Sequence, residues 1–145
     1  LRSRAKDVAD MKQANYVEGR LGLIIDGTGK DYDKISQQAQ QLRLLGYDIH
    51  MVFVNTSLET ALKRNAKRER TLPASIATKS WKNVQSNMGK FSQFFRQGFV
   101  LVDNNDSDED VMGPVYKQIA SLAKSKVKNK IGQQWIAHQL ELKKR

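Results

Sequence analysis

The sequence contains no cysteine, and only two of its 145 residues are proline. The absence of cysteine excludes disulfides, thiolate zinc sites and a cysteine nucleophile, and it fits a reducing compartment. The sequence also lacks a long apolar run, a signal-like start and a lipidation motif. We therefore expect a cytoplasmic protein with no membrane partner.

Acidic residues are the minority among the charged ones. Lys and Arg number 25 against 15 Asp and Glu, which gives a formal net charge of +10. This excess predicts attraction to phosphate-bearing partners, either nucleotides or nucleic acid. The length fits one domain over residues 1–145, and helical spacing of apolar residues predicts a helical tail over residues 110–145.

The stretch from Leu21 to Lys30, LGLIIDGTGK, has an apolar run that stops at a carboxylate and two glycines. Such a run is typical of a strand buried on both faces of a parallel sheet. Asp26 would then lie at the carboxyl end of the strand, which is the edge where open α/β sheets bind ligands. We expect this edge to be the functional one.

Strand-like and helix-like segments alternate after this stretch. Asp31 can cap a helix that Gly46 closes, and the residues from 49 to 54 predict a second strand. Thr56 and Glu59 have the spacing of a capping box for the next helix. A third strand is predicted over residues 99–102, so the fold class is α/β, with three parallel strands flanked by helices.

The helix after the second strand carries a dense basic cluster. Arg64 and Arg68 would lie one turn apart on a common helix face, and Arg70 would fall where Pro73 ends the helix. A solvated basic face is the plainer interpretation of such a cluster. Because the helix starts at the same sheet edge as Asp26, we favour a phosphate-binding role.

Other patterns predict structure rather than chemistry. The apolar residues from Ala77 to Phe95 recur at helical spacing, which favours a core helix over a base-stacking platform. The acidic run over residues 103–110 lacks the glycine and glutamate of an EF-hand loop. His50 and His138 have no partners at metal-ligand spacing, so we assign no metal ligands.

Three segments together resemble P-loop kinases of the zeta-toxin and polynucleotide-kinase group: LIIDGTGKD, then LGYDIHMVFVNTSLETALKRNAKRER, then TLP before the helix with Trp81. The resemblance covers residues 20–104, which we therefore expect to form the core of the domain. Within the group, the sequence is similar above all to uncharacterised bacteriophage members. It implies a P-loop NTPase-like sheet, with ATP and Mg²⁺ as cofactors of the complete enzyme. Asp26 resembles the acid that closes the Walker-B-like strand, and Thr28 resembles a polar neighbour of the phosphates. Arg64, Arg68 and Arg70 resemble the lid arginines, of which Arg64 and Arg68 would also contact the nucleotide.

The sequence contains no GxxxxGK[ST] motif, because Gly29-Lys30 is followed by Asp31. In the resembling family the Walker A strand, loop and helix precede the matching region. We therefore expect them upstream of Leu1, so that the sheet is incomplete and an edge or face is left uncovered. On this hypothesis the chain binds no cofactor tightly and does not catalyse phosphoryl transfer alone, and it either self-associates as a homo-oligomer or exposes an apolar patch.

Two functions stay open at this point. The first is an ATP-dependent kinase that transfers phosphate to a hydroxyl of a nucleotide, a nucleic-acid end or a sugar nucleotide. The second is a non-catalytic basic binding or scaffold protein, with nucleic acid as a partner. A Walker A loop in an upstream reading frame would favour the kinase.

Overall fold

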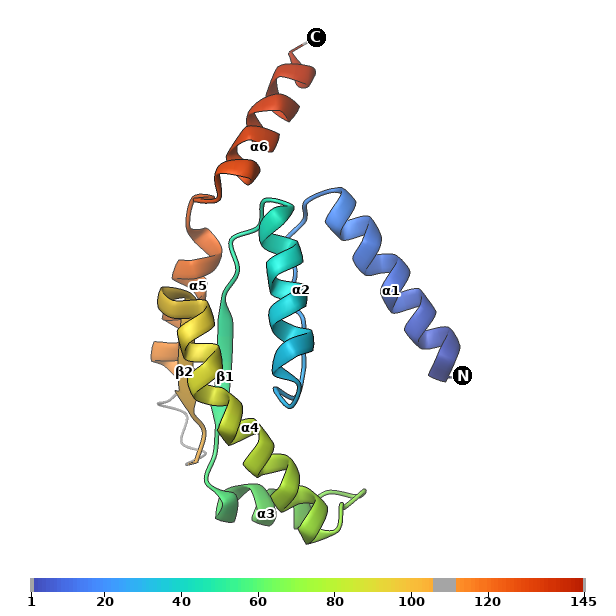
Figure 1. Ribbon diagram of the computed structural model, residues 1–145, viewed down its shortest axis with the longest axis vertical. Coiled ribbons are helices and arrows are strands. Elements are labelled where there is room, and N and C mark those ends of the chain that lie inside the picture. Colours follow the sequence, from blue (N-terminus) through green and yellow to red (C-terminus); the bar gives the residue numbers. More distant parts are fainter. Residues whose placement is uncertain (1, 106–111, 145) are drawn as a thin grey trace.

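The computed structural model describes residues 2–105 and 112–144, and helices alternate with two strands along this part of the chain. Figure 1 shows a central unit made of α2, α4 and the strands, from which α1 and α6 project. The elements in chain order are α1 (Arg2–Glu18), α2 (Tyr32–Leu44), β1 (Met51–Asn55), α3 (Leu58–Ala66), α4 (Ala74–Phe95), the 3₁₀ turn η1 (Arg96–Gly98), β2 (Phe99–Asp103), α5 (Met112–Lys124) and α6 (Lys130–Lys143).

The two strands form a parallel pair. The register runs from Met51 opposite Phe99 to Asn55 opposite Asp103. A parallel pair needs a long connection to bring the chain back to the same end of the sheet, and here α3 and α4 provide it. The predicted strands over residues 49–54 and 99–102 are thus confirmed within two residues.

The strand predicted from Leu21 is wrong for the described structure. Residues 21–28 have no regular secondary structure, and the side chain of Ile24 is fully exposed. A strand requires a hydrogen-bonded neighbour, and the described sheet contains only β1 and β2. Leu21, Ile25, Val52 and Val54 are also exposed, so the expected uncovered apolar surface is present on this segment and on the sheet.

The core lies where α4 crosses the sheet and α2. Phe91 is completely buried, and it packs with Phe53 of β1, Phe95 of α4 and Ala39 of α2. Phe53 in turn lies 5.9 Å from Phe99 of β2, measured between ring centroids. The apolar stripe of this helix is therefore core, as the sequence predicted.

The first residues of α6 are fixed to the turn that follows α2. Asn129 donates hydrogen bonds from its amide to the carbonyls of Arg43 and Tyr47, at 2.8 and 3.2 Å. Gly46, at φ +101°, lies so close to Gly132 that a Cβ on Gly46 would come within 2.7 Å of the Gly132 Cα. Only glycine fits this turn, for both steric and conformational reasons.

We expect two substitutions of apolar side chains to change the free energy of unfolding by different amounts, because one side chain is buried and the other is exposed. Phe91→Ala should destabilise the protein by about 3–5 kcal/mol, because it opens a cavity in the core. Ile24→Ala should change stability by less than about 0.5 kcal/mol, because its side chain is already in water. Urea unfolding followed by circular dichroism measures both. A large loss at Ile24 would instead indicate a buried strand.

The phenol of Tyr47 makes stability depend on alkaline pH. Its hydroxyl donates to the carbonyl of Leu21 at 3.1 Å. Burial raises the pKa of Tyr47, and the nearby Arg20 guanidinium opposes this increase. The folded state thus favours the neutral phenol. The contribution of Tyr47 to the stability of the folded protein is complete below the pKa of about 10 that tyrosine has in the unfolded chain. This contribution is lost as pH rises through the higher pKa of the folded state.

Tyr47→Phe should therefore lose less stability than the natural chain between about pH 9 and pH 12. Urea unfolding across this range, with Tyr116→Phe as the control for an exposed tyrosine, measures the difference. Parallel decline of all three proteins would contradict the assignment to Tyr47.

Candidate functional site

Polar side chains gather where the two parallel strands end. Asn55 is the last residue of β1, and Asp103 is the last residue of β2. A carboxylate oxygen of Asp103 accepts hydrogen bonds from the backbone and side-chain nitrogens of Asn105, at 3.1 and 2.6 Å. The side chain of Asn105 then accepts from the backbone N–H of Ser57, which ties the two strand ends together.

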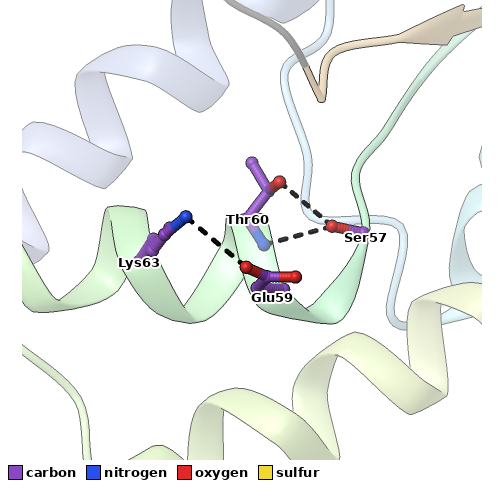
Figure 2. A network of polar contacts seen from close by, with 4 residues as sticks. All are labelled: Ser57, Glu59, Thr60 and Lys63. Carbon is purple, nitrogen blue, oxygen red and sulfur yellow. Dashed lines mark hydrogen bonds and ion pairs between the residues drawn. The ribbon is translucent and has the colours of Figure 1, made fainter.

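The helix α3 begins directly at this edge. Figure 2 shows that Ser57 faces Thr60, whose backbone N–H donates to the Ser57 hydroxyl oxygen at 3.1 Å. Ser57 is therefore the N-cap, and the box predicted from Thr56 and Glu59 is wrong by one residue. The backbone N–H groups of Leu58 and Glu59, at the start of the helix, have no acceptor within the helix.

An open hollow of about 500 Å³ lies beside the first turns of α3. We call it the α3 groove, and it is lined by Ser57, Glu59, Thr60, Lys63, Arg64, Lys67 and Asn105. Three of these side chains are cationic and one is anionic. Glu59 lies 3.4 Å from Lys63, but both side chains are more than 70% exposed, so this ion pair is weak. The described lining of the groove therefore has a surplus of positive charge.

The three predicted arginines do not form one cluster on a helix. Arg64 lines the α3 groove and is half-buried, whereas Arg68 and Arg70 are exposed on the turn that follows the helix. The predicted common face of Arg64 and Arg68 is wrong, because α3 ends at Ala66. Asn65 explains this end: its side chain both donates to and accepts from the backbone of Leu72, at 2.8 and 3.1 Å.

The loop with Asp26 and Thr28 is held against α4. Asn87 is buried, and its amide donates to the carbonyls of Gly29 and Lys30, at 3.1 and 2.9 Å. Gly29 has φ +71°, and a Cβ there would lie 3.8 Å from the Phe53 ring. The loop thus packs near β1, although the predicted strand before it is absent.

Asp26 and Thr28 themselves are exposed. No hydrogen bond or ion pair joins either side chain to the α3 groove among residues 2–105 and 112–144. The described structure therefore brings Arg64 into the groove and leaves the other four predicted residues outside its lining.

Two further side chains of α4 support the end of β1. The indole N–H of Trp81 donates to the carbonyl of Thr56 at 2.8 Å, and the amide of Gln85 donates to the side chain of Asn55. Sequence analysis did not identify Ser57, Thr60 or Asn105 as site residues, whereas Lys63 belongs to the basic cluster for which phosphate binding was expected. The signal for Ser57 and Thr60 was present, because an N-cap at a strand end places free amides at the ligand-binding edge.

We also searched the described residues for a metal site and for a membrane-spanning helix. Across the placed parts of the chain, no three His, Cys, Asp or Glu side chains come together in an arrangement that could hold a metal ion. None of the described helices is both long and apolar enough to span a bilayer. The acidic residues 106–110, considered above for calcium, lie outside the described residues.

The α/β arrangement and the polar edge of the parallel sheet are consistent with a P-loop-like protein. The zeta toxin family model matches residues 1–111, and the chain belongs to this family. Membership indicates a kinase-like, nucleotide-binding function. No curated protein matches the chain. No solved structure matches it either.

Removal of the Asn87 amide should release the loop of Asp26. We expect Asn87→Ala to destabilise the protein by about 1–3 kcal/mol, because two carbonyls lose a buried donor. Amide hydrogen exchange over residues 26–31 should become faster. Asn83→Ala is the matched control, because Asn83 is exposed on the same helix. Equal exchange in the two variants would show that Asn87 does not hold the loop.

Proposed function

We propose that the α3 groove binds the phosphate groups of a nucleotide and belongs to an ATP-dependent kinase. The observation that carries this proposal is the convergence of a capped helix start with Lys63 and Arg64 at the carboxyl ends of β1 and β2. Helix amides and cationic side chains both favour anions, and this edge is where open α/β sheets bind ligands. The acceptor would be a hydroxyl of a nucleotide, a nucleic-acid end or a sugar nucleotide.

The donor set of the groove fits phosphate oxygens. Arg64 offers a guanidinium for bidentate contacts, and Lys63 offers an ammonium once its weak pair with Glu59 opens. Mg²⁺ requires oxygen ligands, and among the described residues that line the groove Glu59 is the one carboxylate. These residues fit the phosphates of ATP rather than its metal ion, so their proposed role is to hold and neutralise phosphate charge.

Phosphoryl transfer depends on positioning and on stabilisation of negative charge. On this proposal Arg64 stabilises charge on the bound phosphates. Arg68 and Arg70 stand on the turn after α3, which Asn65 closes, and they would approach a phosphoryl group from outside the groove. Asp26 and Thr28 would act from the loop that Asn87 holds. These four roles stay predictions.

We expect Arg64→Ala to weaken ATP binding by about fivefold, because it removes a charge-assisted contact. Lys82→Ala on α4 is the control of equal charge, since Lys82 is exposed and does not line the groove. Isothermal titration calorimetry at low and moderate salt measures both. Binding should be weak and salt-dependent, because the groove is open to solvent.

Equal losses in the two variants would favour diffuse attraction to a basic surface and would contradict the proposed groove. Arg68→Ala extends the comparison. If Arg68 contacts the phosphates from the turn, the loss of ATP affinity in Arg68→Ala should lie between the losses in Arg64→Ala and Lys82→Ala. The titration is carried out on the purified protein, so its outcome is independent of the expected cytoplasmic location.

A further inference from the structure

The positive charge of the chain is unevenly distributed. Residues 112–145 carry eight Lys and Arg but a single acidic residue, Glu141. Most of the net charge of +10 therefore belongs to the last quarter of the sequence. Four of these cations, Lys124, Lys126, Lys128 and Lys130, alternate with other residues between the end of α5 and the start of α6. We call these four residues the lysine row.

Lys126 and Lys128 lie on the segment between the two helices, whereas Lys124 ends α5 and Lys130 begins α6. Residues 126–129 have no regular secondary structure, and Asn129 has extended backbone angles. Along this segment the exposed Lys126 and Lys128 alternate with the half-buried Val127 and Asn129, which is the pattern of an extended chain. Successive side chains of an extended chain point to opposite sides. Lys126 and Lys128 therefore share the outer side, about 7 Å apart along the chain.

Backbone and side-chain contacts hold this segment in place. The backbone N–H of Lys128 donates to the Asp48 carboxylate at 2.6 Å, and Gln133 donates to the carbonyl of Val127 at 2.9 Å. Asn129 is bound to the turn after α2 and also caps α6. The row is thus ordered before a partner arrives, which lowers the entropic cost of binding.

The lysines of the row are free to meet an external anion. Within the described residues the ion pairs are Lys63 with Glu59 and Lys144 with Glu141, and neither involves the row. Asp48 is nearby, but its recorded bond is to the backbone of Lys128. An exposed set of like charges on a fixed segment is a repulsive arrangement that a polyanion would relieve.

We propose that the lysine row binds the phosphate backbone of a nucleic acid. A linear series of ammonium groups complements a linear series of phosphates. Lysine supplies point charges rather than bidentate base contacts, so binding should be independent of sequence and strongly salt-dependent. A membrane surface fits less well, because the apolar residue within the row, Val127, faces the protein.

This surface is separate from the α3 groove. In Figure 1 the junction of α5 and α6 lies toward one end of the molecule, whereas α3 lies at the other end. The proposal therefore does not depend on the kinase function, and the two can be tested independently.

The test uses the full chain and a fluorescein-labelled oligothymidine of about 20 nucleotides, followed by fluorescence anisotropy. We expect saturable binding, and Lys126→Gln/Lys128→Gln should weaken it about tenfold. The slope of log K against log salt concentration should become less steep by about 1.4, which corresponds to two lost phosphate contacts on a single strand.

The matched control is Lys6→Gln/Lys12→Gln. It removes two exposed lysines of α1 and gives the same net charge. This control should keep most of the affinity. Equal loss in the row and α1 variants, or no saturable binding by the natural chain, would overturn the proposal.

Vesicles containing phosphatidylserine distinguish the other source of anionic surface. Stronger dependence on Lys126 and Lys128 for vesicle binding than for oligonucleotide binding would overturn the proposal in favour of a membrane. Circular dichroism checks that the double variant is folded. The single substitution Lys126→Gln should weaken oligonucleotide binding by about threefold.

Discussion

The packing of α4 against β1 is the constraint on which the rest of the structure depends. One side of this helix supplies Phe91 and Phe95 to the core. The same helix sends Trp81 and Gln85 to the end of β1, and Asn87 to the loop that carries Asp26. Apolar burial thus fixes the helix, and the fixed helix presents hydrogen-bond donors to the end of β1 and to the loop of Asp26.

Elements with a strong periodic pattern could be predicted from the sequence. The stripe of α4, the two strands and the cap of α2 by Asp31 all follow from local spacing and local hydrogen bonding. The run from Leu21 shows the limit of this reasoning. Its composition is that of a buried strand, but a strand also requires a neighbour, and no periodicity in the run itself reveals whether one is present.

The site was less predictable because side-chain hydrogen bonds decide its details. Asn65 bonds the backbone of Leu72, which ends α3 before Arg68 and removes that arginine from the expected helix face. Ser57 rather than Thr56 caps the helix, so the free amides shift by one residue. Each choice is a competition between polar groups separated by a few residues, and the spacing of apolar residues carries no information about it.

The cationic residues occupy two different settings, for which we propose two kinds of anion recognition. In the α3 groove, Arg64 is half-buried beside helix amides, which suits a compact group such as a phosphate held at one place. The lysine row is exposed and spans the junction of α5 and α6, which suits a partner with repeated charges. Salt screens exposed charges more than partly buried ones, so contacts to the row should weaken faster with salt than the Arg64 contact. The two surfaces both contribute to the net charge of +10, and the proposed recognition differs between them because their exposure and geometry differ.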